Sequence, residues 1–170
     1  MTLRKSIKWL ILGVILTGVV YYFYPEKRLA DNAKINKIVI NKSERKMMVY
    51  DGNDLLNTYT VSLGASPVGD KQSEGDNKTP EGHYYVALKL GLGVSKYRKS
   101  LRVSYPSPEQ IKMGKKGSDI MIHGLGSKYH YFGKFHRFYD WTQGCIAVTD
   151  DEIDQIYKAT KVGVAIIITP

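Results

Sequence analysis

The chain of 170 residues carries 25 Lys and Arg against 16 Asp and Glu, which gives a formal net charge of +9. Its apolar fraction of 43% is typical of a packed domain and excludes a largely disordered chain. The single cysteine excludes an internal disulfide and any metal or iron–sulfur site built from several cysteines. Frequent glycine (16) and tyrosine (13) favour a turn-rich β protein over a helical bundle.

The N-terminal segment differs in composition from the rest of the chain. Residues 1–8 form a basic flank with Arg4, Lys5 and Lys8, whereas residues 9–24 carry no charge. As a helix these uncharged residues would span about 24 Å, slightly less than the ~30 Å hydrocarbon core of a bilayer. We expect an uncleaved transmembrane signal-anchor, because no small-x-small cleavage motif follows. A cleaved signal peptide and a buried helix of a soluble protein are the alternatives.

Residues 25–34 are expected to form a linker to an exported domain. Basic residues also follow the apolar segment, so the count of positive charges on its two sides does not fix its orientation. We expect the N-terminus to stay inside and the rest to reach the periplasmic or cell-wall side of the envelope, or to be secreted if the segment is cleaved. No arginine-rich stripe is present, so nucleic acid is not an expected partner.

Residues 35–169 are predicted to form one mainly β domain, a β-rich α+β fold shaped as a β-sandwich or half-open barrel with one or two short helices. Short apolar or alternating segments between turn residues predict strands at 35–40, 47–50, 55–63, 84–88, 101–105, 120–122 and 163–169. Residues 64–82 are rich in Gly, Pro, Asp and Lys and predict a long functional loop.

Two helix starts are recognisable from capping residues. Ser107 followed by Pro108, with Gln110 three positions after the cap, predicts a helix that ends near residue 114. Thr149 and Glu152 form a second capping box, at the start of a helix with acidic residues in its first turn.

His123 and Cys145 are the candidate catalytic pair, because each lies beside a glycine on an apolar segment. A thiol nucleophile needs a neighbouring base and donors for the oxyanion, and the amides of Gly144 and Cys145 are natural donors. We expect pairing to lower the pKa of the thiol and to raise that of the imidazole. From these residues alone, a buried structural cysteine and histidine remain an equal alternative.

Other chemistries lack their motifs. The remaining histidines, His83, His130 and His136, do not have the spacing of a metal site, so no metal is expected. The segment Gly91-Leu92-Gly93 lacks the lysine and Ser/Thr of a phosphate-binding loop and is predicted to be a hairpin tip.

Four short motifs in a fixed order connect the candidate pair to a known family. They are Ser62-Leu63-Gly64, Thr79-Pro80-Glu81-Gly82-His83-Tyr84, Ile122-His123-Gly124 and Thr142-Gln143-Gly144-Cys145. In this order they resemble the L,D-transpeptidase catalytic domain (YkuD-like) over residues 35–169. The segment from Asp140 to Thr149 resembles the ErfK/YbiS/YcfS/YnhG-type branch of murein L,D-transpeptidases.

The resemblance implies a β-sandwich-like fold and a reaction on peptidoglycan stem peptides without a cofactor. Cys145 would attack the carbonyl of the third stem residue, expel the terminal D-Ala and form a thioester, which the side-chain amine of another stem converts into a 3→3 cross-link. His123 would be the general base. Gly124 and Gly144 would shape the cleft, and Thr142 would support the histidine or the loop.

The chain departs from the family pattern at three places. Gln143 stands where the motif usually carries His, and Ala147 where many members carry an Arg or Asn suited to a substrate carboxylate. Residues 128–139 form an insertion-like loop. Arg137 is therefore a candidate for the missing cation, and Gln143, Tyr131 and Trp141 are candidates for contacts with substrate, the two aromatic residues having a core position as the alternative.

Two further functions remain open. With water as acceptor, the same pair gives an L,D-carboxypeptidase or an amidase that hydrolyses stem-peptide or protein–peptidoglycan bonds. The alternative of another class is a non-catalytic peptidoglycan-binding module, against which the intact Cys–His pair argues. We expect a monomer held to the membrane through residues 9–24.

Overall fold

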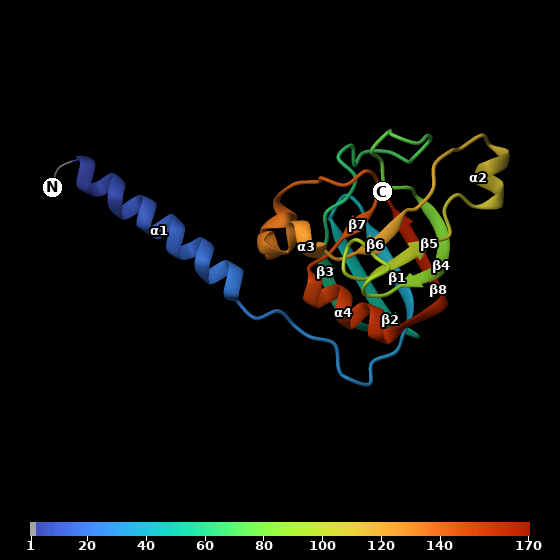
Figure 1. Cartoon of the computed structure of the whole chain (residues 1–170), viewed down its shortest axis with the longest axis horizontal. Helices are drawn as coiled ribbons and strands as arrows, with labels where there is room; N and C mark the ends of the chain where they lie inside the picture. Colours follow the sequence, from blue (N-terminus) through green and yellow to red (C-terminus); the bar gives the residue numbers. More distant parts are fainter. Residues whose placement is uncertain (1–2) are drawn as a thin grey trace.

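The computed structural model describes residues 3–170 of the chain, and the side chains from residue 6 onward (Figure 1). Residues 1 and 2 of the predicted basic flank, and the side chains of Arg4 and Lys5, lie outside this description. Helix α1 (Leu3–Phe23) projects from a rounded body that holds all the strands. It begins at Leu3 and not at Trp9, since no residue before Trp9 interrupts a helix. Its 21 residues span about 32 Å.

The apolar part of α1 has the length and composition of a membrane span. The window Ser6–Phe23 has a mean hydropathy of 1.7, and none of its residues is fully buried. The same properties are found in signal sequences near an N-terminus.

Eight strands form one curled sheet, which confirms the predicted half-open barrel. The strands are β1 (Ile35–Asn41), β2 (Lys46–Asp51), β3 (Asp54–Thr60), β4 (Gly82–Leu90), β5 (Ser100–Val103), β6 (Met121–His123), β7 (Ile146–Ala147) and β8 (Thr160–Thr169). Their order across the sheet is β3-β2-β1-β8-β4-β5-β6-β7. Only the pairs β1–β8 and β6–β7 are parallel. Because the last strand, β8, pairs with the first strand, β1, the two ends of the domain are held together.

The predicted strand 55–63 is too long by its last three residues. The chain leaves β2 after Thr60, and Ser62 instead pairs with Ala147, through amide–carbonyl hydrogen bonds of 3.0 and 2.9 Å. Val61, Ser62 and Leu63 are all fully buried, so the alternation of burial seen in β3 ends with that strand. This crossing brings the segment after β3 beside the strand that follows Cys145.

Four short helical segments accompany the sheet. They are α2 (Pro108–Lys112), α3 (Gly126–Tyr129), the 3-10 segment η1 (His130–Phe138) and α4 (Asp150–Ala159). Both predicted capping boxes are present, at Ser107 and at Thr149. Helix α4 inserts Ile153 and Ile156 into the core. Residues 128–139 were expected to be a loop, but residues 128–138 are helical, with a kink at Gly133, where φ is +47°. The kink interrupts the periodicity by which a helix is recognised in a sequence.

The predicted loop 64–82 contains no strand or helix until β4 begins at Gly82. Asp76 organises it, because its carboxylate accepts hydrogen bonds from the Lys71 ammonium and from the amides of Gln72, Ser73 and Lys78. Burial alone would raise the pKa of Asp76, but these donors hold it well below its usual range.

Candidate active site

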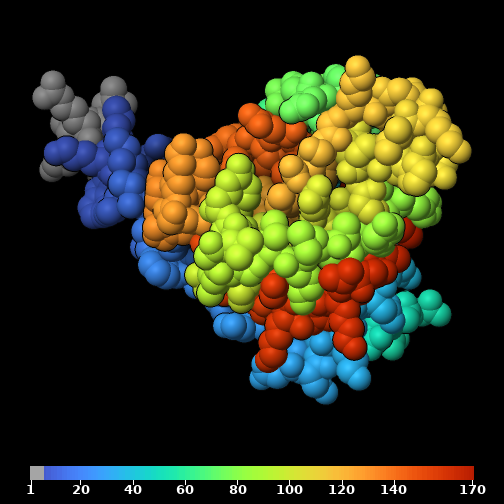
Figure 2. All heavy atoms as spheres, turned by 45° about the vertical axis from the view of Figure 1, so that its right-hand side comes forward, coloured from blue at the N-terminus to red at the C-terminus, as the bar shows by residue number. Residues whose placement is uncertain are grey.

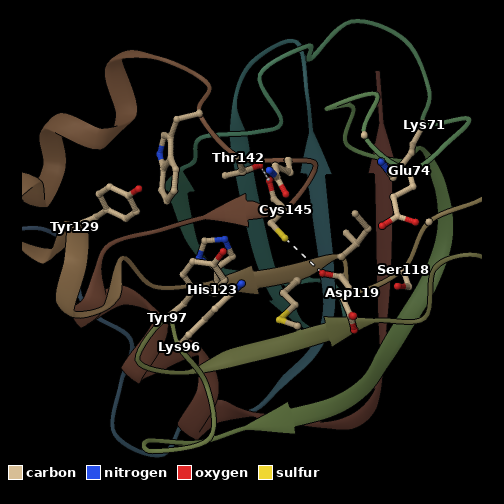
Figure 3. A pocket seen from close by; sticks show the side chains of 16 residues that line it. Lys71, Glu74, Lys96, Tyr97, Ser118, Asp119, His123, Tyr129, Thr142 and Cys145 are labelled. Atoms are coloured by element: carbon tan, nitrogen blue, oxygen red, sulfur yellow. Dashed lines mark hydrogen bonds between the residues drawn. The ribbon is translucent and has the colours of Figure 1, made fainter.

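A cleft of about 540 Å³ opens where β5, β6 and the segment before β7 meet (Figure 3). Its walls include His123 and Cys145, together with residues of five other segments: Lys71, Glu74 and Gly75; Lys96 and Tyr97; Gly117 to Met121; Tyr129; and Trp141 to Gln143. Strand pairing explains why the two candidate catalytic residues line the same cleft. Because β6 and β7 are parallel with His123 opposite Ala147, the residue two positions before Ala147 lies next to β6.

His123 is held in one orientation by its backbone neighbour and by two aromatic rings. Its side chain is almost fully buried, and Nδ1 lies 2.6 Å from the carbonyl oxygen of Gly124. A carbonyl only accepts hydrogen bonds, so Nδ1 carries the proton and Nε2 keeps a free lone pair. The ring stacks on Tyr97 at 4.0 Å and meets the edge of Trp141 at 6.0 Å.

Burial sets the charge state of the pair. It lowers the pKa of His123 to about 4, because the buried imidazolium would lose its hydration. It also raises the pKa of the Cys145 thiol, and the nearby Lys96 ammonium offsets this only in part. The expected shifts toward an ion pair were therefore wrong in direction. In the resting site the pair is a neutral thiol and a neutral imidazole.

The turn before Cys145 depends on Thr142 and Gly144. The Thr142 hydroxyl accepts a hydrogen bond from the Gly144 amide at 3.1 Å and donates to the Cys145 carbonyl at 2.7 Å. Thr142 thus supports this loop and not His123. Gly144 has φ of +125°, and a Cβ there would lie 2.6 Å from the carbonyl oxygen of Lys78. Only glycine fits this position without strain.

The two predicted oxyanion donors are not equivalent. The Gly144 amide already donates to Thr142, whereas the Cys145 amide has no acceptor within the described part of the chain. The thiol itself is half-buried and donates to the carbonyl oxygen of Asp119, with Sγ and that oxygen 3.6 Å apart. The Cys145 amide is therefore the available donor at this turn.

Gly124 lies behind the cleft and not in its wall. A Cβ at this position would lie 2.6 Å from Oδ1 of Asp150 and 2.7 Å from the Ile153 side chain. The glycine thus allows α4 to pack closely against the residue whose carbonyl holds His123.

The candidate substrate-binding residues divide into two groups. Trp141 and Gln143 line the cleft, and their contact with substrate stays a prediction. Tyr131 does not line it; its side chain is exposed on η1. Arg137 does not line it either, because its guanidinium is held by Glu152 at 2.5 Å and Glu26 at 2.9 Å.

Sequence reasoning missed Lys96, Tyr97 and Tyr129. All three line the cleft, but Lys96 and Tyr97 lie in the connection from β4 to β5, far from the catalytic motifs in sequence. The Lys96 ammonium lies 5.0 Å from the centre of the Tyr97 ring. No ion pair involves Lys96 among the side chains of residues 6–170. A Lys followed by a Tyr in the connection between two strands carries no sequence signal that would have identified either residue as part of the cleft.

Comparison with known proteins identifies the domain. Residues 35–168 match the family model of the L,D-transpeptidase catalytic domain, YkuD. YafK of Escherichia coli K12, named provisionally as an L,D-transpeptidase, is 30% identical over 125 residues, which cover 71% of this chain and 45% of YafK. YqjB of Bacillus subtilis, with the same provisional name, is 25% identical over 140 residues, 78% of this chain and 70% of YqjB. The chain thus spans about half the length of YafK.

Solved structures show the same fold. The helical cell shape determining protein Pgp2 of Campylobacter jejuni is 23% identical, with a TM-score of 0.63 over 81% of this chain and 48% of that chain. An L,D-transpeptidase from Mycobacterium smegmatis is 15% identical, with a TM-score of 0.56 over 81% of this chain and 59% of that chain.

The fold, the cleft and the family match together define the class of protein. The chain belongs to the YkuD family of L,D-transpeptidase catalytic domains, as the four motifs predicted.

Proposed function

We propose that the chain is a cysteine-dependent peptidoglycan L,D-transpeptidase. One observation carries the proposal: a half-buried thiol and a base with a free Nε2 line the same cleft, and the Gly124 carbonyl fixes the tautomer of that base. A stem tetrapeptide is the acyl donor, and the side-chain amine of a second stem is the acceptor.

The neutral pair requires proton transfer during attack. Nε2 of His123 takes the thiol proton as Sγ of Cys145 bonds to the carbonyl carbon of the third stem residue. The Cys145 amide donates to the resulting oxyanion. When the peptide C–N bond breaks, His123 returns the proton to the departing amine of D-Ala and leaves a thioester.

Acyl transfer then repeats the proton transfers with a new nucleophile. The acceptor amine attacks the thioester carbon while His123 takes a proton from it. Collapse of this intermediate breaks the C–S bond, forms the new peptide bond and returns the proton to sulfur. No cofactor is needed, because the thioester retains the energy of the broken peptide bond.

Lys96 is the candidate cation for a carboxylate of the donor stem. Arg137 is already paired with two glutamates, and Ala147 has no polar side chain. Lys96 lies close enough to the pair to lower the pKa of the Cys145 thiol, and it lines the cleft without an acidic partner in residues 6–170. Its ammonium would hold the carboxylate beside the scissile bond.

The chain organisation that we propose is unchanged from the expectation. Residues 1–8 are a basic flank, 9–24 a transmembrane anchor, 25–34 a linker and 35–169 the catalytic domain, exported to the envelope. The length and apolar surface of α1 support the anchor. We also propose that the chain is a monomer.

Product analysis tests the activity. The full chain in detergent micelles is incubated with tetrapeptide muropeptides, beside Cys145→Ala and His123→Gln variants, and products are read by mass spectrometry. Cysteine-dependent 3→3 dimers, or exchange of the terminal D-amino acid, support transpeptidation. Tripeptides alone would assign an L,D-carboxypeptidase, and an unchanged substrate would favour an amidase with a protein-linked substrate or a binding module.

A further inference from the structure

The helical insertion of the catalytic domain packs against the end of the proposed membrane anchor. In Figure 1 and Figure 2 the segment of α3 and η1, coloured orange, lies next to α1. The Phe135 ring lies 5.7 Å from the rings of both Tyr21 and Tyr22. The Phe138 ring lies 5.6 Å from Tyr21. Phe135 also reaches Gly18, since a Cβ there would lie 3.8 Å from the ring.

Polar contacts fix this arrangement. The Lys134 ammonium donates to the carbonyl oxygens of Tyr21 and Tyr24, which are among those that the end of α1 leaves without helical partners. Lys134 and Arg137 both pair with Glu26, and Arg137 also pairs with Glu152 of α4. The end of α1 is therefore held against the domain and is not a free tether.

The linker strengthens this attachment. The amide of Leu29 donates to the Gln155 side chain at 2.8 Å, and the Asn57 side chain donates to the Lys27 carbonyl at 2.9 Å. Residues 27–29 thus lie along the domain, and the depth of α1 in a bilayer determines the position of the domain relative to it.

Aromatic side chains at this junction remain exposed. Tyr131, Phe138 and Tyr139 of the insertion region are 60%, 70% and 59% exposed, and Phe23 at the end of α1 is 76% exposed. We call Phe23, Tyr131, Phe138 and Tyr139 the aromatic collar. Tyrosine rings, with an apolar body and a polar tip, concentrate at the headgroup level of membranes, and the exposed phenylalanine rings beside them add apolar surface. The collar lies at the end of the apolar span, which is the level of that interface if α1 crosses the bilayer.

We propose that η1 lies in the lipid headgroup region of the leaflet from which α1 emerges, with the aromatic collar in contact with lipid. The inference rests on the proposed anchoring by α1. Its consequence concerns the substrate, because Tyr129 of the cleft wall contacts both Phe132 of η1 and Trp141, with ring centres 6.4 and 5.2 Å apart. The catalytic cleft would thus be fixed close to the membrane, where it acts on stem peptides of peptidoglycan at the membrane surface.

Site-specific fluorescence in vesicles tests the contact with lipid. In the Cys145→Ala chain, which has no other cysteine, Phe138→Cys and Met113→Cys each provide one labelling site for an NBD fluorophore. Met113 is the matched control, because it is 67% exposed and lies at the end of α2, on the far side of the body from α1 (Figure 1). The full chains are placed in vesicles of phosphatidylcholine and phosphatidylglycerol with or without lipids that carry a shallow doxyl quencher.

We expect doxyl lipid to quench the label at position 138 several-fold more than the label at 113, and aqueous iodide to show the reverse order. Equal iodide quenching at both positions, in chains that resist extraction by alkaline carbonate, would overturn the inference and leave the anchor intact. Release of the chains by carbonate would overturn the anchor itself, and the inference with it.

Discussion

Two buried histidines make the stability of the domain depend on pH. Burial lowers the pKa of His123 to about 4 and that of His136 to about 3, the latter also under the influence of the Arg137 charge. Both side chains are almost fully buried, at 1% and 3% exposure. In the unfolded chain each would titrate near pH 6.5. Between pH 6.5 and 4 the unfolded state therefore binds more protons than the folded state, and stability falls as the pH falls.

The size of the effect follows from these pKa values. Lowering the pH from 7 to 5 protonates each unfolded histidine but leaves the folded one neutral, which costs about 2 kcal/mol per histidine and about 4 kcal/mol for both. Urea unfolding of the full chain in mild detergent at the two pH values measures this difference. His136→Gln, which retains a hydrogen-bonding side chain next to Ser62, should remove about half of it.

Comparing the variant with the unchanged chain separates the contribution of His136 to the pH-dependent stability from that of the carboxylates. Glu26, Asp76 and Asp154 have lowered pKa values, and the stability that they contribute is lost at lower pH, near and below 4. If His136→Gln and the unchanged chain lose the same stability between pH 7 and 5, the buried neutral state of His136 is refuted.

Three further predictions concern the cleft. Lys96→Met should raise KM for a donor stem about tenfold, because one charge-assisted hydrogen bond to the substrate is lost, and should leave kcat nearly unchanged. Lys128→Met is the control, since Lys128 also lies over a tyrosine ring but outside the cleft; equal effects would refute the assignment. Iodoacetamide should alkylate Cys145 slowly at pH 7, because burial raises the pKa of the thiol. The alkylation rate should keep increasing with pH and reach no plateau below pH 9. A plateau below pH 7 would instead indicate an ion pair. Gly144→Ala should abolish activity and lower the thermal midpoint, whereas Gly93→Ala, at φ of +80° in open space, should retain activity and cost about 1 kcal/mol. An active Gly144→Ala enzyme would falsify the close approach to Lys78.

The sequence was sufficient to predict what local chemistry determines. Capping residues located α2 and α4, and the apolar segments that end at His123 and begin after Cys145 located the pair. The curled sheet followed from short strands without βαβ alternation.

The parts that it did not predict depend on long-range packing. The group that orients His123 is a backbone carbonyl, for which no side-chain pattern exists. Tyr97 reaches the imidazole from a different connection. Arg137 was a candidate substrate cation only while its two glutamate partners were unknown. The direction of the pKa shifts depended on burial, which adjacent residues in the sequence do not reveal.

Trapping the thioester tests the central claim most directly. The full chain in micelles is mixed with a tetrapeptide muropeptide whose side-chain amine is acetylated, so that no acceptor amine is present; the mixture is quenched in acid, and the intact mass of the chain is measured beside that of Cys145→Ala. We predict a mass increase equal to the donor minus D-Ala, located on the peptide that contains Cys145 and absent from the variant. The absence of this adduct from a chain that cross-links unmodified stems, or an active Cys145→Ala chain, would contradict catalysis by this thiol.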